Sequence, residues 1–219
     1  MAPTEINDVF SAQKSRENLK QAQSVESRIQ KLVKLRTWIH ENRTRIHEVL
    51  FKDFKKPAEE VDLSEIYVVL SEIKHALKHI KSWVKPQKVD STLALMGSKS
   101  YIHHEPKGVC LILAPWNFPF NLTVGPLVSA LAAGNSVIIK PSELTPNCSD
   151  LIVSMASEVF QPHEVAVFTG DKEVAGELLA LPFDHIFFTG SPRVGKIVME
   201  QAAKHLTSVT LELGGKSPA

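Results

Sequence analysis

The chain has 219 residues, of which 43% are apolar and 22% charged, and its formal net charge is +1. This ordinary globular composition excludes a disordered chain, a collagen and a disulfide scaffold, and the balanced charge argues against a nucleic-acid partner. The longest apolar run, Val109 to Trp116, is too short to cross a bilayer, and the N-terminal sequence lacks a secretory signal. We therefore expect a soluble, cytoplasmic protein.

Residues 1–90 predict a helical segment. Apolar residues recur three and four positions apart, and Pro57 interrupts the pattern between two long stretches. The two series are Val25, Ile29, Leu32, Leu35 and Ile39, and then Leu63, Ile66, Leu70, Ile73, Leu77 and Ile80. Between Ser11 and Lys85 we expect two or three long amphipathic helices.

Residues 91–107 predict a β-hairpin. The expected strands are Ser91–Met96 and Ser100–His104, and the turn between them is Gly97, Ser98 and Lys99. The hairpin would separate the helical segment from a third region, 108–219, in which the pattern changes again.

Residues 108–219 have the pattern of a doubly wound α/β domain with a parallel sheet. Short, almost continuously apolar runs alternate with helical stretches, which is typical of strands covered on both faces. The expected strands are Gly108–Leu113, Ser136–Ile139, Val165–Phe168, His185–Phe188 and Val209–Leu213, and the expected helices are Gly125–Ala133 (with Pro126 in its first turn), Asn147–Val159, Glu173–Ala180 and Val194–His205. Ligands of such folds lie beyond the carboxyl ends of the strands.

Two of these strand ends carry candidate catalytic groups. Asn117 follows the first strand between Pro115 and Pro119, which fix the backbone around it. Its amide is either an oxyanion donor or a turn residue. Glu212 lies at the end of the fifth strand, before two glycines, and is either a general base or a partner in a structural salt bridge.

Lys140 and Glu143 follow the second strand and are candidates for ribose binding. The glutamate is able to accept hydrogen bonds from vicinal hydroxyls and the lysine to donate to them. The alternative is a solvated loop with a helix cap.

A glycine-bracketed turn after the fourth strand is a candidate phosphate site. Gly190, Ser191 and Gly195 open a helix, whose N-terminal N–H groups bind anions. The turn nearly matches the phosphate loop of nucleoside triphosphatases, but Ile197 stands where that loop needs a hydroxyl for Mg²⁺. A G-x-G-x-x-G fingerprint does not occur in the chain.

No metal site is expected. His75 and His79 are four apart on a helix but lack the H-E-x-x-H pattern. Cys110 lies inside a buried strand and Cys148 has no evident base partner, so neither is expected to be a nucleophile.

The motifs at the strand ends together resemble the aldehyde dehydrogenase superfamily. They are A-P-W-N-F-P at 114–119, K-P-S-E at 140–143, F-T-G-S-x-x-V-G at 188–195 and L-E-L-G-G-K at 211–216. The resemblance extends over the whole chain, and the helical segment and hairpin resemble the class 3 or fatty aldehyde dehydrogenase branch.

This resemblance implies a dinucleotide-binding domain of the aldehyde dehydrogenase type, which lacks the usual glycine fingerprint. The implied cofactor is NAD, with NADP as the alternative. Lys140 and Glu143 would hold the adenosine ribose, and Trp116 would also contact the cofactor. The pyrophosphate turn would be formed by Gly190, Ser191 and Gly195.

The implied reaction is oxidation of an aldehyde to a carboxylic acid through a cysteine thiohemiacetal and thioester. Asn117 would donate to the oxyanion, and Glu212 would activate water for thioester hydrolysis. The substrate would be a medium- or long-chain aliphatic or an aromatic aldehyde. The hairpin would belong to an oligomerisation arm, which implies a homodimer.

The chain departs from the family in lacking the nucleophilic cysteine, which would lie beyond Ala219. Neither Cys110 nor Cys148 matches its position, so the chain resembles only the N-terminal portion of a family enzyme and is expected to be inactive alone. The alternatives are a non-catalytic nucleotide-binding fragment and, less favoured, a phosphate-loop hydrolase. Membrane attachment through a C-terminal tail stays open.

Overall fold

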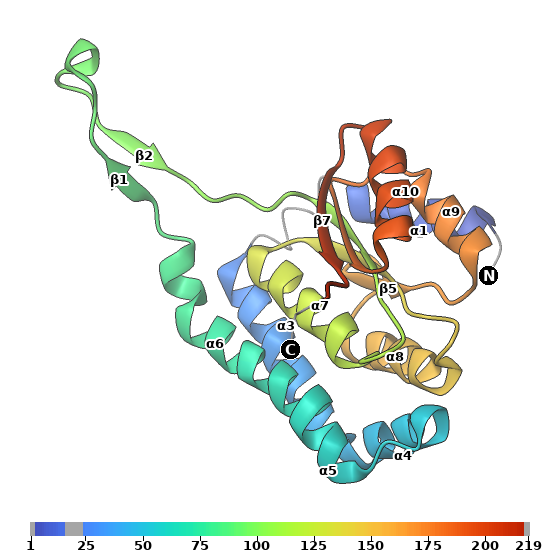
Figure 1. Cartoon of the computed structure of the whole chain (residues 1–219). Coiled ribbons are helices and arrows are strands. Elements are labelled where there is room, and N and C mark those ends of the chain that lie inside the picture. The colour runs from blue at the N-terminus through green and yellow to red at the C-terminus, as the bar shows by residue number, and fades with distance from the viewer. Residues whose placement is uncertain (1–2, 16–23, 217–219) are drawn as a thin grey trace.

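The computed structural model describes residues 3–15 and 24–216 and contains a five-stranded parallel sheet with helices on both faces (Figure 1). The predicted α/β fold is confirmed. The strands lie in the order β5-β4-β3-β6-β7, and all four neighbouring pairs are parallel. Their bounds are β3 Val109–Leu113, β4 Ser136–Lys140, β5 Val165–Val167, β6 His185–Gly190 and β7 Ser208–Leu213.

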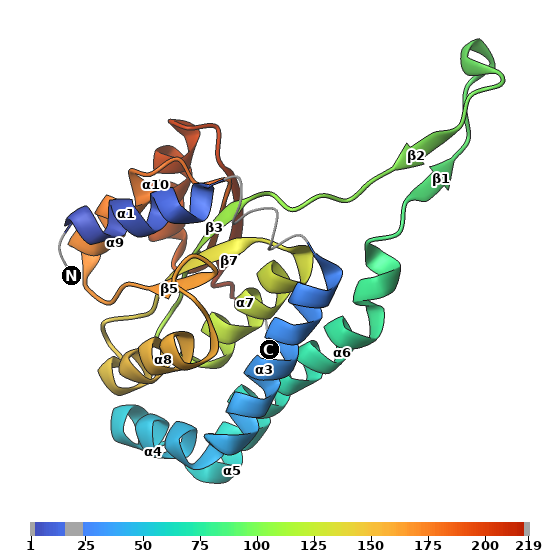
Figure 2. The same ribbon diagram turned by 180° about the vertical axis from the view of Figure 1, so that it is seen from behind.

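Two hydrophobic clusters cover the two faces of this sheet. Figures 1 and 2 show the helices on the two sides of the sheet from opposite directions. Side chains of β3 alternate between them: Ile112 packs into one cluster, and Leu111 and Leu113 into the other. The first face is covered by α3 (Val25–Glu41), α4 (Arg43–Phe54), α6 (Tyr67–Trp83), α7 (Asn121–Ala133) and α8 (Pro146–Val159). The second is covered by α1 (Pro3–Lys14), α9 (Lys172–Leu179) and α10 (Pro192–Ala203).

The strand order reverses between β3 and β6. The chain runs outward from β3 to β4 and β5, and then crosses back to pair β6 with the free edge of β3. Because α7 and α10 follow β3 and β6 on opposite faces, their N-termini diverge at the carboxyl edge of the sheet. In doubly wound folds this switch point is where ligands bind.

The helical segment is close to its prediction. α4 ends at Phe54, and Lys55 takes a left-handed conformation (φ 60°) just before Pro57. A short helix α5 (Ala58–Val61) and a π-helix η1 (Asp62–Ile66) then lead into α6. The helix α1, which lies on the opposite face of the sheet, begins ahead of the stretch predicted from Ser11.

The first strand of the predicted hairpin is wrong. The paired strands are β1 (Gln87–Val89) and β2 (Ser100–Ile102), with Val89 opposite Ser100. The segment predicted as a strand, Ser91–Met96, forms a loop with a short 3₁₀ helix, η2 (Leu93–Leu95). Its leucines and Met96 are exposed, so no sheet face selects the alternation that suggested a strand. The hairpin therefore starts inside the range assigned to the helical segment, and it projects from the body (Figure 1).

The start of α7 is also a correction. The helix begins at Asn121, four residues before the predicted start at Gly125, and Pro126 lies inside it rather than in its first turn. A proline there has no N–H to donate to Leu122, so the sequence rule placed the boundary too late. The earlier start brings the N-terminus of α7 directly after the loop that carries Asn117.

Within the described ranges, no helix is long and apolar enough to cross a membrane.

Candidate functional site

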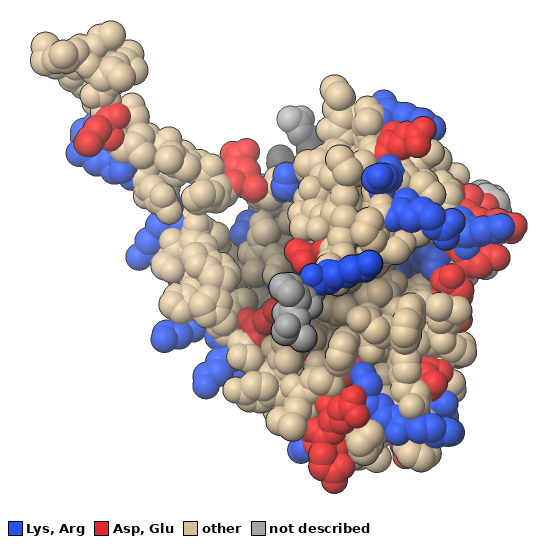
Figure 3. Space-filling view, in the orientation of Figure 1, with Lys and Arg blue, Asp and Glu red and all other residues tan. Residues whose placement is uncertain are grey.

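A cleft of about 1510 Å³ opens at the carboxyl edge of the sheet between α7 and α10 and extends along the sheet to Lys107, Asn135 and His185. It lies between the helical layer and the outer strands, where the molecule is hollowed near the middle of Figure 3. The predicted residues that line it come from four strand-end loops and are Trp116, Asn117, Lys140, Glu143, Gly190, Ser191 and Glu212. The structure thus brings together residues up to about a hundred positions apart in the sequence.

The loop after β3 presents Trp116 and Asn117 to the cleft. Both side chains are exposed, and the Trp116 ring stacks on Phe54 with centroids 6.2 Å apart. The loop is anchored at its start, where the Ala114 N–H donates to the Lys140 carbonyl at 3.1 Å. The carbonyl of Asn117 accepts a hydrogen bond from Lys56 Nζ at 3.4 Å. These contacts hold the backbone, and within the described ranges no hydrogen bond to the Asn117 side-chain amide is formed.

Lys140 and Glu143 form an ion pair, with Lys140 Nζ 3.0 Å from Glu143 Oε2. The lysine also donates to the Pro141 carbonyl at 2.9 Å and is buried, whereas the glutamate side chain is half exposed. Partial burial pushes the pKa of Glu143 up, but hydrogen bonds from its own N–H and from Lys140 outweigh it, and the pKa lies below its usual value. Glu143 is therefore an ionised acceptor that faces the cleft.

The turn after β6 opens α10. Ser191 is the N-cap residue, and its Oγ accepts from the Val194 N–H at 3.3 Å, while Pro192 starts the helix. A Cβ on Gly190 would lie 2.5 Å from the Phe188 ring, so this position admits only glycine without a shift. Gly195 is not among the residues that line the cleft, and a Cβ there would lie 2.9 Å from Leu213 Cδ2, so α10 packs closely against β7 at this glycine.

Glu212 lies opposite Thr189 in the β6–β7 register and is exposed at the cleft wall. None of the ion pairs among the described residues includes Glu212, which disfavours the salt-bridge interpretation. Thr189 was not anticipated from the sequence. Its Oγ1 is buried beside the cleft and has no hydrogen-bond partner in the described part of the chain.

A buried ion pair that was not predicted from the sequence lies behind the Asn117 loop. Lys56 Nζ lies 2.6 Å from Glu65 Oε1, and the side chains are 7% and 0% exposed. A signal for it exists, because Glu65 falls between Val61 and Val69 at four-residue spacing on a stripe that is otherwise apolar and buried.

The two cysteines are both buried. Burial raises the pKa of Cys110 to about 12 and raises the pKa of Cys148 well above its usual value. A thiol in such surroundings is a poor nucleophile.

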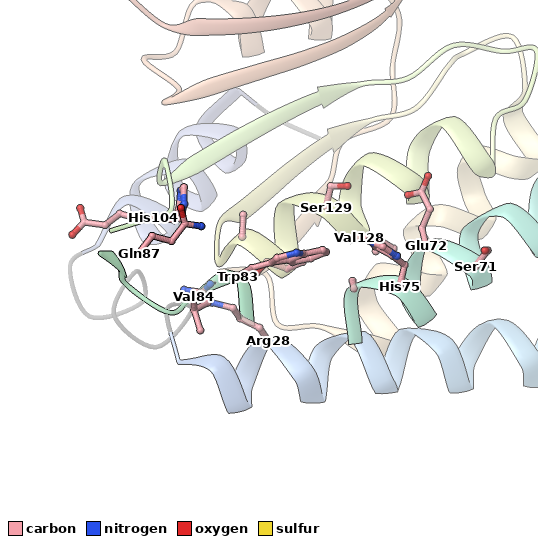
Figure 4. A pocket seen from close by; sticks show the side chains of 14 residues that line it. Arg28, Ser71, Glu72, His75, Trp83, Val84, Gln87, His104, Val128 and Ser129 are labelled. Carbon is pink, nitrogen blue, oxygen red and sulfur yellow. Dashed lines mark hydrogen bonds between the residues drawn. The ribbon is translucent and has the colours of Figure 1, made fainter. Parts of the chain in front are cut away.

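A second cavity, of about 770 Å³, lies between α6, α7 and the base of the hairpin (Figure 4). Glu72, His75 and Trp83 of α6 and Ser129 of α7 line it. The His75 and His79 rings lie in contact, with centroids 4.5 Å apart and ring planes tilted by 39°. Across the described residues, no group of three or more potential metal ligands comes together.

Comparison with known proteins decides the family. The model of the aldehyde dehydrogenase family matches residues 2–219. The chain belongs to this family. It is 46% identical to AldX of Bacillus subtilis over 98% of the chain and 48% of that protein, and 46% identical to human aldehyde dehydrogenase family 3 member B1 over 88% and 41%. The expected class 3 relationship is confirmed, and the chain spans about half the length of these relatives.

Solved structures agree with this assignment. Staphylococcus aureus AldH in a substrate-bound state superposes with a TM-score of 0.94 at 44% identity, over 97% of this chain and 46% of that one. Aldehyde dehydrogenase C of Pseudomonas syringae, bound to NAD⁺ and octanal, has a TM-score of 0.85 at 24% identity, over 99% and 44%. The succinic semialdehyde dehydrogenase of Streptococcus pyogenes, bound to NADP⁺, has 0.87 at 20%, over 98% and 47%. The last two show a shared fold.

Proposed function

We propose that the protein to which this chain belongs is an NAD(P)-dependent aldehyde dehydrogenase, and that this chain supplies the cofactor-binding cleft, the oxyanion donor and the general base. The observation that carries the proposal is the convergence of four strand-end loops on one cleft at the switch point of the sheet. A non-catalytic nucleotide-binding fragment would need neither an asparagine nor a carboxylate at that cleft.

The residues present fit a dinucleotide. The Lys140–Glu143 pair offers a donor and an ionised acceptor to ribose hydroxyls. The N-terminus of α10 and the glycine at position 190 suit a close approach of pyrophosphate. The Thr189 hydroxyl, which has no hydrogen-bond partner among the described residues, lies beside the cleft. Glu143 favours NAD over NADP, because its carboxylate would repel a 2′-phosphate.

The chemistry assigned to this chain has two parts. NAD(P), when bound, supplies the hydride acceptor. The amide of Asn117 donates to the carbonyl oxygen of the aldehyde as negative charge develops there during thiol attack. The carboxylate of Glu212 takes a proton from the water that cleaves the acyl group. The attacking thiol is outside this chain, so the chain alone is inactive in this proposal.

The proposed substrates are medium- or long-chain aliphatic or aromatic aldehydes. Support comes from AldH and aldehyde dehydrogenase C, whose structures hold substrate and octanal respectively. The proposed assembly is a homodimer that uses the hairpin. Leu93 and Met96 at its tip are 87% and 84% exposed, and the tip carries no coloured charge in Figure 3.

A chimera tests the function. We define it as this chain followed by the part of AldX that lies beyond their match. Reduction of NAD⁺ by the chimera in the presence of octanal, absent from the chain alone, supports the proposal. A chimera that folds, binds NAD⁺ and fails to oxidise every aldehyde tried would contradict it.

A further inference from the structure

Two carboxylates from one short segment cap the two helices that follow the catalytic and ribose loops. Glu65 Oε2 accepts from the Asn121 N–H at 2.8 Å, at the start of α7. Asp53 Oδ2 accepts from the Cys148 N–H at 2.9 Å, at the start of α8. Neither helix has a side-chain cap from its own N-cap residue, so both depend on residues far away in the sequence.

Glu65 lies in the π-helix η1, which packs against α7. A π-turn adds a residue to the helical repeat and changes where the following side chains point, and such turns occur often at functional sites. Here Glu65 occupies a fully buried position in line with Val61 and Val69. The same turn presents the Ser64 carbonyl, which accepts from Asn121 Nδ2 at 3.1 Å. Two successive residues of η1 therefore hold the first residue of α7.

Lys56 contacts the Asn117 loop directly. Besides its ion pair with Glu65, its Nζ lies 3.4 Å from the Asn117 carbonyl oxygen and 4.4 Å from the centroid of the Phe118 ring. The lysine is 8% exposed. One buried cation thus connects the Asn117 backbone to the carboxylate that caps the next helix.

We propose that Lys56 and Glu65 form a positioning pair that fixes the loop 114–120 and thereby aims the Asn117 amide into the cleft. The inference rests on the proposed function only for the role of Asn117. The pair itself touches the backbone at that residue and four residues after it: the Asn117 carbonyl through Lys56, and the Asn121 N–H at the start of α7 through Glu65.

The energetics favour positioning over simple stabilisation. A buried ion pair gains little net stability, because desolvation offsets the attraction between the charges, whereas removing one partner leaves a costly unpaired group. Burial raises the pKa of Glu65, and Lys56 and the N–H groups of Asn121 and Phe120 oppose this rise. Without Lys56, the carboxyl group gains a proton more readily and becomes a weaker acceptor for α7.

A second buried ion pair provides a matched control. Lys31 Nζ lies 2.9 Å from Glu164 Oε1, and the lysine is as deeply buried as Lys56. Glu164 directly precedes β5, so this pair lies at the amino ends of the strands, away from the cleft. Asp53 provides a second comparison, because it caps α8 rather than α7.

The experiment is amide hydrogen exchange on the chain of 219 residues, with the variants Lys56→Met, Lys56→Arg, Glu65→Gln, Lys31→Met and Asp53→Asn. Under the proposal, Lys56→Met and Glu65→Gln raise exchange at residues 116–124 by about tenfold or more over the change in the rest of the core. Lys56→Arg keeps exchange slow at these residues, because the guanidinium still reaches both Glu65 and the Asn117 carbonyl. Lys31→Met leaves residues 116–124 at the level of the rest of the core, and Asp53→Asn moves the effect to residues 146–150.

Uniformly faster exchange in Lys56→Met and Glu65→Gln, no different from Lys31→Met, would overturn the proposal and leave a merely structural pair. If Lys56→Met fails to fold, the result for Glu65→Gln decides between the two outcomes. This variant is expected to fold, because its side chain keeps an oxygen acceptor for the Asn121 N–H. In the chimera, Lys56→Met is expected to lower kcat with little change in the KM for NAD⁺. An inactive parent chimera would count against the proposed function, whereas the exchange result on the chain is independent of turnover.

Discussion

The ammonium group of Lys140 lies 3.0 Å from Glu143 Oε2, with the lysine buried and the glutamate half exposed at the cleft. The buried partner of the pair thus lies in the core, and the exposed partner faces the cleft. The Pro141 carbonyl also accepts from Lys140, so the lysine position does not depend on Glu143 alone.

The first prediction concerns this pair. Lys140→Met in the chimera is expected to weaken NAD⁺ binding about 10- to 100-fold, the value of one hydrogen bond that involves a charged group. Glu143→Gln is expected to shift the ratio of NADP⁺ to NAD⁺ affinity upward, because the charge that repels a 2′-phosphate is removed. Calorimetric titration measures both, with the exposed Lys34→Met as the control. Unchanged affinity in Lys140→Met would exclude the ribose role.

Asn117→Ala is expected to lower the rate of hydride transfer in a single turnover of the chimera by about 100- to 1000-fold, the usual cost of one oxyanion donor. NAD⁺ affinity should stay close to that of the parent, because the amide is assigned to the substrate. A rate within a factor of about 3 of the parent would show that Asn117 is a turn residue and not an oxyanion donor.

A third prediction concerns acid stability. A hydrogen bond from Arg43, opposed by partial burial and assisted by His47, lowers the pKa of Asp62 to about 2. A carboxyl with a lowered pKa stabilises the folded chain above its unfolded pKa, and that contribution is lost as pH falls from about 4 to 2. Because Arg43 is largely exposed, Asp62→Asn should cost about 1 kcal/mol at pH 7. In urea unfolding, the difference in unfolding free energy between the parent and Asp62→Asn should be smaller at pH 3 than at pH 7. A difference that stays constant or grows would refute the prediction.

Gly108→Ala is expected to be strongly destabilising. Gly108 has φ +130°, and a Cβ there would lie 2.2 Å from Asp184 Oδ2, the oxygen that accepts from the Val109 N–H at 2.7 Å. Backbone strain and the displaced carboxylate together should cost about 2–4 kcal/mol. Gly97→Ala is the control: its φ is +93°, but nothing lies within 4 Å of the added atom, so only about 1 kcal/mol is expected. Equal midpoints in thermal unfolding would argue against the contact with Asp184.

The fold was largely predictable because the buried strands leave a strong pattern. All five positions of β3 and of β4 are buried, and such runs are hard to mistake when helices separate them. The first strand of the hairpin was predicted wrongly for the opposite reason. Leu93, Leu95 and Met96 are exposed, so their apolar character says nothing about the local backbone. The predicted start of α7 was wrong because the rule that places proline in the first turn of a helix is overridden here by the packing of the helix.

The cleft residues were predictable where a polar group ends a strand, as at Asn117 and Glu212. Glu65 was not, although its position on a buried helical stripe marks it as unusual. The Asn121 N–H is brought to it by the packing of η1 against the start of α7, and Lys56 by the turn between α4 and α5. Sequence spacing carries no record of contacts between distant residues. It also does not show that Gly195 packs against Leu213 and stays out of the cleft lining.

The central claim is that this chain carries the oxyanion donor and the deacylation base of an aldehyde dehydrogenase. Its most direct test is Glu212→Gln in the chimera, mixed rapidly with NAD⁺ and octanal. The account predicts a burst of about one equivalent of NADH per active site and then slow turnover, because hydride transfer precedes the step that needs the base. Loss of the burst together with turnover would contradict it and assign Glu212 to the thiol or to the structure.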